Sequence, residues 1–178
     1  MHTLILAVLC LCAAIAQAQS GIWIDVPFIK QPAEGCGAAS IAMVMQYWQA
    51  HQGGPQSQAA DVAIIQRALF SEKAHGIYAS DLQQYLNREG FRTYVLRGDA
   101  ALLEHHLQRG RPMIVALQPA SNSLLHYVVV TGIDPAQHAI LINDPAQRKL
   151  LKVDTRNFEQ EWRATGNWTL LALPNQGQ

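Results

Sequence analysis

The hydrophobic pattern of this chain changes period near Gly110, and this change constrains the fold more than any other feature. Before Gly110 apolar residues recur at helical spacing, and after it they alternate or form short runs typical of strands. Helices are expected at about 37–50, 58–70, 79–88, 99–109 and 155–162, and strands or extended segments at about 22–29, 112–118, 126–133, 138–143, 149–153 and 168–174. Helices first and an antiparallel sheet second predict an α+β fold, in which N-terminal helices pack on a C-terminal sheet in two layers.

The N-terminus has the pattern of a secretory signal peptide. Residues 4–18 form an apolar run that ends in small residues, and Ala16 and Ala18 stand where a signal peptidase requires them. We expect cleavage after Ala18, which leaves one domain, residues 19–178, in the periplasm or outside the cell. The alternative is an uncleaved anchor, although the run is shorter than the roughly 20 residues of a membrane span. No later segment is continuously apolar over that length, so no stable membrane span is expected after cleavage.

The expected export makes the number of cysteines informative. The chain has three cysteines, of which Cys10 and Cys12 lie in the signal segment, so Cys36 is left without an intramolecular partner. Oxidising compartments favour paired cysteines, and a single one is therefore unusual. Cys36 is either a buried small hydrophobe or a reactive thiol.

The position of Cys36 favours the reactive thiol. It stands between Gly35 and Gly37, directly before a segment that is rich in helix formers and apolar nearly all round. The thiolate is the nucleophilic form of cysteine, and the dipole and free N–H groups of a helix N-terminus stabilise a negative charge there. Glycine on both sides allows a sharp turn and the close approach of a substrate backbone. The alternative is that both glycines merely shape a loop.

A base for this thiol can be found by following the strand that begins at His126. A histidine at such a position is often only a strand-end residue, but the strand leads into a hairpin with its turn at Pro135. If the hairpin is centred on Pro135 without a bulge, Ile133 faces Gln137, and His126 faces Asp144. Directly opposed residues have Cβ atoms about 4.5 to 5.5 Å apart. The register therefore predicts a carboxylate beside the imidazole.

These residues suffice for nucleophilic catalysis. His126 can take the proton of Cys36, and Asp144 can orient the imidazole and favour its charged form. Asn143 is the second choice as the orienting residue, because it alternates to the other face of a regular strand. Gln31 can direct an amide N–H at a developing oxyanion, together with the backbone N–H of Cys36.

Composition excludes several other functions. Lys and Arg number 13, Asp and Glu also number 13, and the formal net charge is zero, so no basic surface for nucleic acid is expected. The sequence has no phosphate-binding glycine loop, no HExxH motif and no cysteine pair with zinc spacing. His105 and His106 are adjacent on an expected helix and diverge by about 100°. No metal site or cofactor site is therefore predicted.

Four sequence elements together resemble a known family. They are Gln31, EGCGAASIAMVMQYW around Cys36, HYVVVTGID from His126 and INDP around Asp144. They are similar to the papain-like cysteine peptidases that process bacteriocin leader peptides after a double glycine, and to their exported stand-alone relatives. The similarity extends from about Val26 to about Leu173. It implies a papain-like fold in which Cys36 is the nucleophile, His126 the base, Asp144 the orienting residue and Gln31 the oxyanion donor.

The expected function is that of an exported cysteine peptidase. The resemblance implies a peptide or protein substrate, small residues such as Gly-Gly before the cleaved bond, and a companion secretion system as a partner. Two alternatives remain open. One is a catalytically silent domain that binds a peptide or a secretion partner in the same cleft. The other is a thiol acyltransferase or amidase, since both share a thioester intermediate with hydrolysis.

Overall fold

The fold is described from a computed structural model, which covers residues 21–52, 57–120 and 124–175. The expected signal segment 1–18 lies outside the described residues. The helices are α1 (Cys36–Gln52), α2 (Val62–Leu69), α3 (Ala79–Arg88), α4 (Ala100–Leu107) and α5 (Thr155–Ala164), with short 3-10 turns η1 (Gln58–Ala60), η2 (Glu72–Ala74) and η3 (Pro135–Gln137). The strands are β1 (Ile22–Trp23), β2 (Phe91–Arg97), β3 (Met113–Leu117), β4 (His126–Asp134), β5 (Ala139–Asn143), β6 (Leu151–Asp154) and β7 (Trp168–Pro174).

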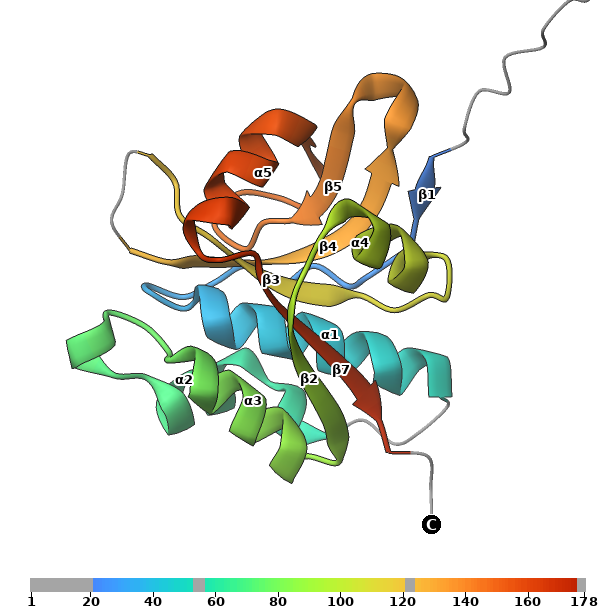
Figure 1. The fold of residues 1–178 in the computed structure, drawn as a ribbon. Coiled ribbons are helices and arrows are strands. Elements are labelled where there is room, and N and C mark those ends of the chain that lie inside the picture. Colours follow the sequence, from blue (N-terminus) through green and yellow to red (C-terminus); the bar gives the residue numbers. More distant parts are fainter. Residues whose placement is uncertain (1–20, 53–56, 121–123, 176–178) are drawn as a thin grey trace, which may run out of the picture.

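The strands form one antiparallel seven-stranded sheet in the order β2-β7-β3-β4-β5-β6, and β1 pairs with β4. Helices α1, α2 and α3 lie on one face of this sheet, whereas α4 and α5 lie on the other (Figure 1). The α+β class, with N-terminal helices packed on the sheet, is thus confirmed. The second face of the sheet adds a helical layer to the two expected layers.

Helix α1 is the centre of the first core, and its position follows from its sequence. An alanine-rich stretch with methionine and β-branched residues has no polar face, so the helix is stable only when it is covered on all sides. Residues 37–45 are all buried, and they pack against the sheet as well as against α2 and α3. Ser40 is fully buried and donates a hydrogen bond to the carbonyl oxygen of Tyr127 over 3.2 Å. This bond ties the first turns of α1 to the start of β4.

Two expected elements differ from the structure. The helix expected at 58–70 is interrupted at Asp61, whose carboxylate caps α2 by accepting hydrogen bonds from the N–H groups of Ala63 and Ile64 at 2.8 and 3.1 Å. Capping explains this break, because an aspartate side chain that accepts the first N–H groups of a helix favours a helix start at that residue.

Of the extended segment at 22–29, only β1 forms strand pairs with the sheet, and the N–H of Ile24 adds one bond to the carbonyl oxygen of Thr131 over 2.8 Å.

Strand β2 was not predicted. It lies between α3 and α4 and pairs along its whole length with β7, from Phe91 opposite Pro174 to Arg97 opposite Trp168. Its signal was weak because Tyr94 and Val95 are exposed at 40% and 46%, so the strand lacks a clean alternation of buried and exposed residues. The sheet therefore begins before Gly110, in the half of the chain that was expected to be helical.

The register predicted for the β4–β5 hairpin is wrong. Three residues, Pro135 to Gln137, form a 3-10 turn, and His138 follows in the left-handed conformation, so Ile133 faces Ile140 rather than Gln137. The pairing then shifts by one residue at a bulge between Val130 and Gly132. As a result Val129 faces Asn143, and the last pair of the ladder lies three residues from His126.

None of the helices within the described ranges combines the length and the apolar character that a membrane crossing requires.

Candidate active site

Cys36 is the first residue of α1, and a tight turn precedes it. The N–H of Gly35 donates to the carbonyl oxygen of Pro32 over 3.0 Å, with Glu34 in the left-handed region at φ 54°. A Cβ atom on Gly35 would lie only 2.5 Å from Cγ of Pro32. On Gly37 it would meet the side chain of Ile77 at 3.2 Å. Close packing within the chain thus explains glycine at both positions, in agreement with the loop-shaping alternative.

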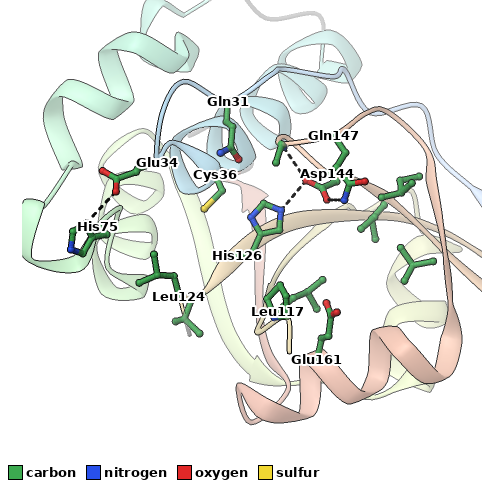
Figure 2. A pocket seen from close by; sticks show the side chains of 16 residues that line it. Gln31, Glu34, Cys36, His75, Leu117, Leu124, His126, Asp144, Gln147 and Glu161 are labelled. Carbon is green, nitrogen blue, oxygen red and sulfur yellow. Dashed lines mark hydrogen bonds and ion pairs between the residues drawn. The ribbon is translucent and has the colours of Figure 1, made fainter. Parts of the chain in front are cut away.

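The thiol and the imidazole face each other across the two halves of the fold. Cys36 comes from α1 and His126 is the first residue of β4. Their side chains lie next to each other (Figure 2), and the thiol hydrogen-bonds the imidazole. Cys36 is partly exposed and makes no disulfide. The side chain of His126 is 22% exposed, whereas that of Asp144 is only 5% exposed. A thiol that is reachable from solvent and lies beside a buried imidazole–carboxylate pair is not a simple core residue.

His126 and Asp144 are hydrogen-bonded despite the wrong register. Nε2 of His126 lies 2.8 Å from Oδ1 of Asp144. Asp144 lies one residue beyond the end of β5, so the chain is free of the strand alternation there and its side chain turns back toward the imidazole. Asn143, the second choice for this role, is fully buried elsewhere. Its amide donates to the carbonyl oxygens of Val26 and Pro27 at 3.1 and 3.3 Å.

The electrostatics of the pair favour an imidazolium. Burial alone would lower the pKa of His126, but its hydrogen bonds to Asp144 and Cys36, together with their negative charges, raise the pKa to about 9. Burial alone would raise the pKa of Asp144, but the bonds and charge of His126 and the bonds from Ala146 and Gln147 lower it. Asp144 is thus a carboxylate that accepts a hydrogen bond from the proton-bearing Nε2 of His126. Consequently Nδ1 is the ring nitrogen left for the thiol.

Gln147 is a site residue that the sequence analysis missed. Its Nε2 donates to Oδ2 of Asp144 over 2.6 Å, and the N–H of Ala146 donates to Oδ1 over 2.9 Å. Both carboxylate oxygens are therefore held from the loop that follows β5. The Asx turn in INDPAQ was a signal for the Ala146 bond, because an aspartate in a turn commonly accepts a hydrogen bond from the backbone two residues later. It gave no signal for the Gln147 side chain.

Gln31 lies five residues before Cys36, and Figure 2 shows its amide directly above Cys36. The backbone N–H of Gln31 donates to the carbonyl oxygen of Pro145 over 3.0 Å, which fastens this loop to the loop that carries Asp144. Its Oε1 atom is buried and accepts no hydrogen bond from the described residues. An acceptor oxygen cannot stabilise an oxyanion, so that role requires the Nε2 N–H groups of the same amide.

These groups line a groove of about 560 Å³. The thiol, the imidazole and the Gln31 amide lie along one part of it, and aliphatic side chains cover much of the remainder. The lining residues are Gln31, Glu34, Cys36, His75, Leu117, Pro119, Leu124, Leu125, His126, Ile142, Asp144, Ala146, Gln147, Leu151, Val153 and Glu161. Such a groove can hold an extended chain with one carbonyl group next to Cys36.

Among the described residues, no group of three or more His, Cys, Asp or Glu side chains is arranged to hold a metal ion. The chemistry that the site offers is that of a thiol with an adjacent imidazole. A thiolate can attack a carbonyl carbon, and an imidazolium can protonate the leaving group.

The fold is shared with solved peptidase structures. A protein from Bacillus anthracis assigned as a C39-like peptidase superimposes with a TM-score of 0.68 at 20% identity, covering 89% of this chain and 100% of that chain. The peptidase domain of Streptococcus ComA, a bifunctional ABC transporter of a quorum-sensing pathway, gives 0.65 at 24% identity, covering 84% and 99%. A double-glycine-motif protease from an AMS/PCAT transporter, in complex with the leader peptide, gives 0.63 at 24% identity, covering 85% and 94%.

At these identities the superpositions establish the fold, which is that of the papain-like cysteine peptidases. No protein with a curated description matches the chain in sequence. The family profile described as Peptidase C39-like matches residues 23–170, which is most of the chain and includes the thiol, the imidazole, the carboxylate and Gln31. The chain therefore belongs to the Peptidase C39-like family.

Proposed function

We propose that this protein is an exported cysteine peptidase that cleaves a peptide or protein through Cys36, His126 and Asp144, with Gln31 as an oxyanion donor. The observation that carries the proposal is the Cys36–His126–Asp144 chain of contacts at the wall of an open groove. Membership of the C39-like family supports it further, because the named relatives are peptidases.

The first half of the reaction starts from a Cys36 thiolate and a His126 imidazolium. The Cys36 thiolate attacks the carbonyl carbon of the peptide bond, a C–S bond forms, and the carbonyl electrons move to oxygen. The amide of Gln31 and the backbone N–H of Cys36 stabilise this oxyanion. The imidazolium of His126 gives its proton from Nδ1 to the leaving nitrogen, the C–N bond breaks, and a thioester remains.

Water completes the turnover. The neutral imidazole takes a proton from a water molecule, whose oxygen attacks the thioester carbonyl. The C–S bond breaks, the carboxylic acid product leaves, and the thiolate–imidazolium pair is restored. Asp144 keeps the Nε2–H tautomer throughout, so that Nδ1 alone exchanges protons.

The substrate side of the proposal rests on the family. The transporter-derived relative binds a leader peptide, and double-glycine processing would place small residues before the cleaved bond. The signal-like N-terminus supports action beyond the membrane, on a substrate delivered by a companion secretion system. N-terminal sequencing of the exported protein tests the location, and a chain beginning at Gln19 is the expected result.

Activity is tested with a thiol-reactive peptide probe and with cleavage of secreted peptides followed by mass spectrometry. The probe should label Cys36 in the wild type, and a Cys36→Ala variant should show neither labelling nor cleavage. Transfer of the acyl group to an added amine, in preference to water, would favour the acyltransferase alternative. Peptide binding by a wild-type protein that neither labels nor cleaves would favour the silent binding domain.

A further inference from the structure

The groove contains a carboxylate that the proposed chemistry does not use. Glu161 lines it on the side of α5, and Figure 2 shows its side chain rising from that helix toward Leu117. Its carboxylate takes part in none of the ion pairs or side-chain hydrogen bonds of the described residues. The other carboxylates of the groove are engaged: Glu34 pairs with His75 at 3.2 Å, and Asp144 pairs with His126.

The position of Glu161 is fixed by its helix. Phe158 and Trp162 on either side of it are exposed by only 1% and 2%, and both pack into the core on the face of the sheet that α4 and α5 cover. The carbonyl oxygen of Glu161 accepts the N–H of Gln118 over 3.1 Å, which fastens this turn of α5 to the end of β3. The backbone of Glu161 is thus held at the wall of the groove, with its carboxylate within reach of a bound chain.

The surroundings of Glu161 are aliphatic. Leu117, Leu151 and Val153 line the same groove, and its described lining includes no lysine or arginine. A carboxylate at the edge of an aliphatic surface matches a long basic side chain, whose methylene stem covers apolar area while its charged end reaches the acid. An apolar substrate side chain would fill the same space but leave the carboxylate without a partner.

We infer that Glu161 forms a subsite that selects a lysine or arginine side chain of the peptide substrate. The inference rests on the proposed peptidase function, and it deepens that function by naming a substrate class: peptides with a basic residue near the cleaved bond. An exposed to half-buried ion pair contributes up to about 1 kcal/mol, which corresponds to a preference of about fivefold.

Binding to the Cys36→Ala protein tests this subsite without turnover. Fluorescence anisotropy compares labelled peptides in which lysine, norleucine or glutamate is moved through each position. Norleucine is the matched control, since it has a linear stem and no charge. The lysine peptide should bind about fivefold more tightly than the norleucine peptide at one position, and the preference should shrink with added salt.

Two further variants assign the preference. Glu161→Gln in the Cys36→Ala protein should reduce the lysine-to-norleucine ratio to about one, whereas Glu34→Gln should keep it. Equal affinities in the Cys36→Ala protein, a ratio unchanged by Glu161→Gln, or no binding by any peptide would each overturn the inference. A lysine preference in a protein whose wild type cleaves nothing would leave the subsite in place and reject the peptidase. Cleavage by the wild type, together with equal binding of the lysine and norleucine peptides, would support the peptidase and reject the Glu161 subsite.

Discussion

Nε2 of His126 lies 2.8 Å from Oδ1 of Asp144, and this bond determines which ring nitrogen faces Cys36. Because the pKa of Asp144 is lowered, its side chain is a carboxylate and accepts a hydrogen bond from a proton-bearing Nε2. Nδ1 is then the ring nitrogen left for the thiol. Burial lowers the pKa of His126, but Asp144 and Cys36 together raise it to about 9. Asp144 therefore orients the imidazole and also contributes to its positive charge.

This relationship predicts the alkaline limit of activity. The imidazolium protonates the leaving nitrogen, so kcat/KM should fall as pH rises through about 9, where His126 loses its proton. Asp144→Asn removes a negative charge and the stronger acceptor, so the pKa of His126 falls and the alkaline limit should move to lower pH. The rate at the optimum should also fall, although some activity remains. A pH profile of kcat/KM for both proteins provides the measurement, and an alkaline limit that does not move would reject the assignment to His126.

Stability should show the same linkage. The folded-state pKa of His126 is raised from 6.5 to about 9, so the protonated imidazole stabilises the fold fully below about pH 6.5. That contribution is lost as pH rises from about 6.5 to 9. The free energy of unfolding from urea titrations should therefore decline more in the wild type than in His126→Gln across this range. His105→Gln, at an exposed histidine, should keep the wild-type decline.

How far the sequence predicted the site depends on which part is considered. The helix start at Cys36 and the strand start at His126 follow from local patterns, a breaker before an apolar helix and a polar loop before an apolar strand. The pairing of His126 with Asp144 was expected for a reason that the structure contradicts. A 3-10 turn at 135–137 and a bulge after Val130 change the register, and neither has a distinct sequence signature. The pair forms because Asp144 lies beyond the strand, where alternation no longer applies.

The unpredicted parts share a physical cause. Strand β2 lies at the edge of the sheet and has few buried side chains, so its own sequence gives a weak strand pattern. It is held in the sheet by pairing with β7, which is distant in sequence. Gln147 acts through a single side-chain bond to Asp144, and polar loop residues carry no periodicity that would reveal such a bond. Long-range pairing and side-chain bonds both depend on tertiary structure.

Gln147 should act as a positioning residue. Its 2.6 Å bond to Oδ2 helps to lower the pKa of Asp144, so Gln147→Leu should raise that pKa and move the acid limit of kcat/KM to higher pH. The thiol probe should still label Cys36, at a lower rate. Gln137→Leu, which alters an exposed glutamine in the hairpin turn, is the matched control and should keep the wild-type profile. A purely structural role for Gln147 would lower the melting temperature without moving the acid limit.

Gln31 should affect the rate and leave the stability largely unchanged. Removal of one oxyanion donor typically costs about 2.7 to 4 kcal/mol, or roughly 100- to 1,000-fold in kcat. Gln31→Ala keeps the backbone bond to Pro145 and removes an Oε1 atom that has no partner among the described residues, so the melting temperature should stay near that of the wild type. Gln31→Glu should be at least as slow, because its negative charge repels the oxyanion. Activity close to the wild type in Gln31→Ala would exclude it as an oxyanion donor.

The tight turn before Cys36 should couple packing to catalysis. In Gly35→Ala the new Cβ would lie 2.5 Å from Cγ and 2.6 Å from Cδ of Pro32, so the turn must shift, at a cost of about 1 to 3 kcal/mol. A shift there changes the distance between the Gln31 amide and the thiol, so kcat should fall together with the melting temperature. Adding Pro32→Ala removes both ring carbons and should restore part of each loss, while the carbonyl oxygen of Pro32, 3.0 Å from the new Cβ, keeps the rescue incomplete. Because the contact is between these two residues, losses in the double variant that equal the sum of the single losses would show that the clash with Pro32 is not the source of the loss in Gly35→Ala.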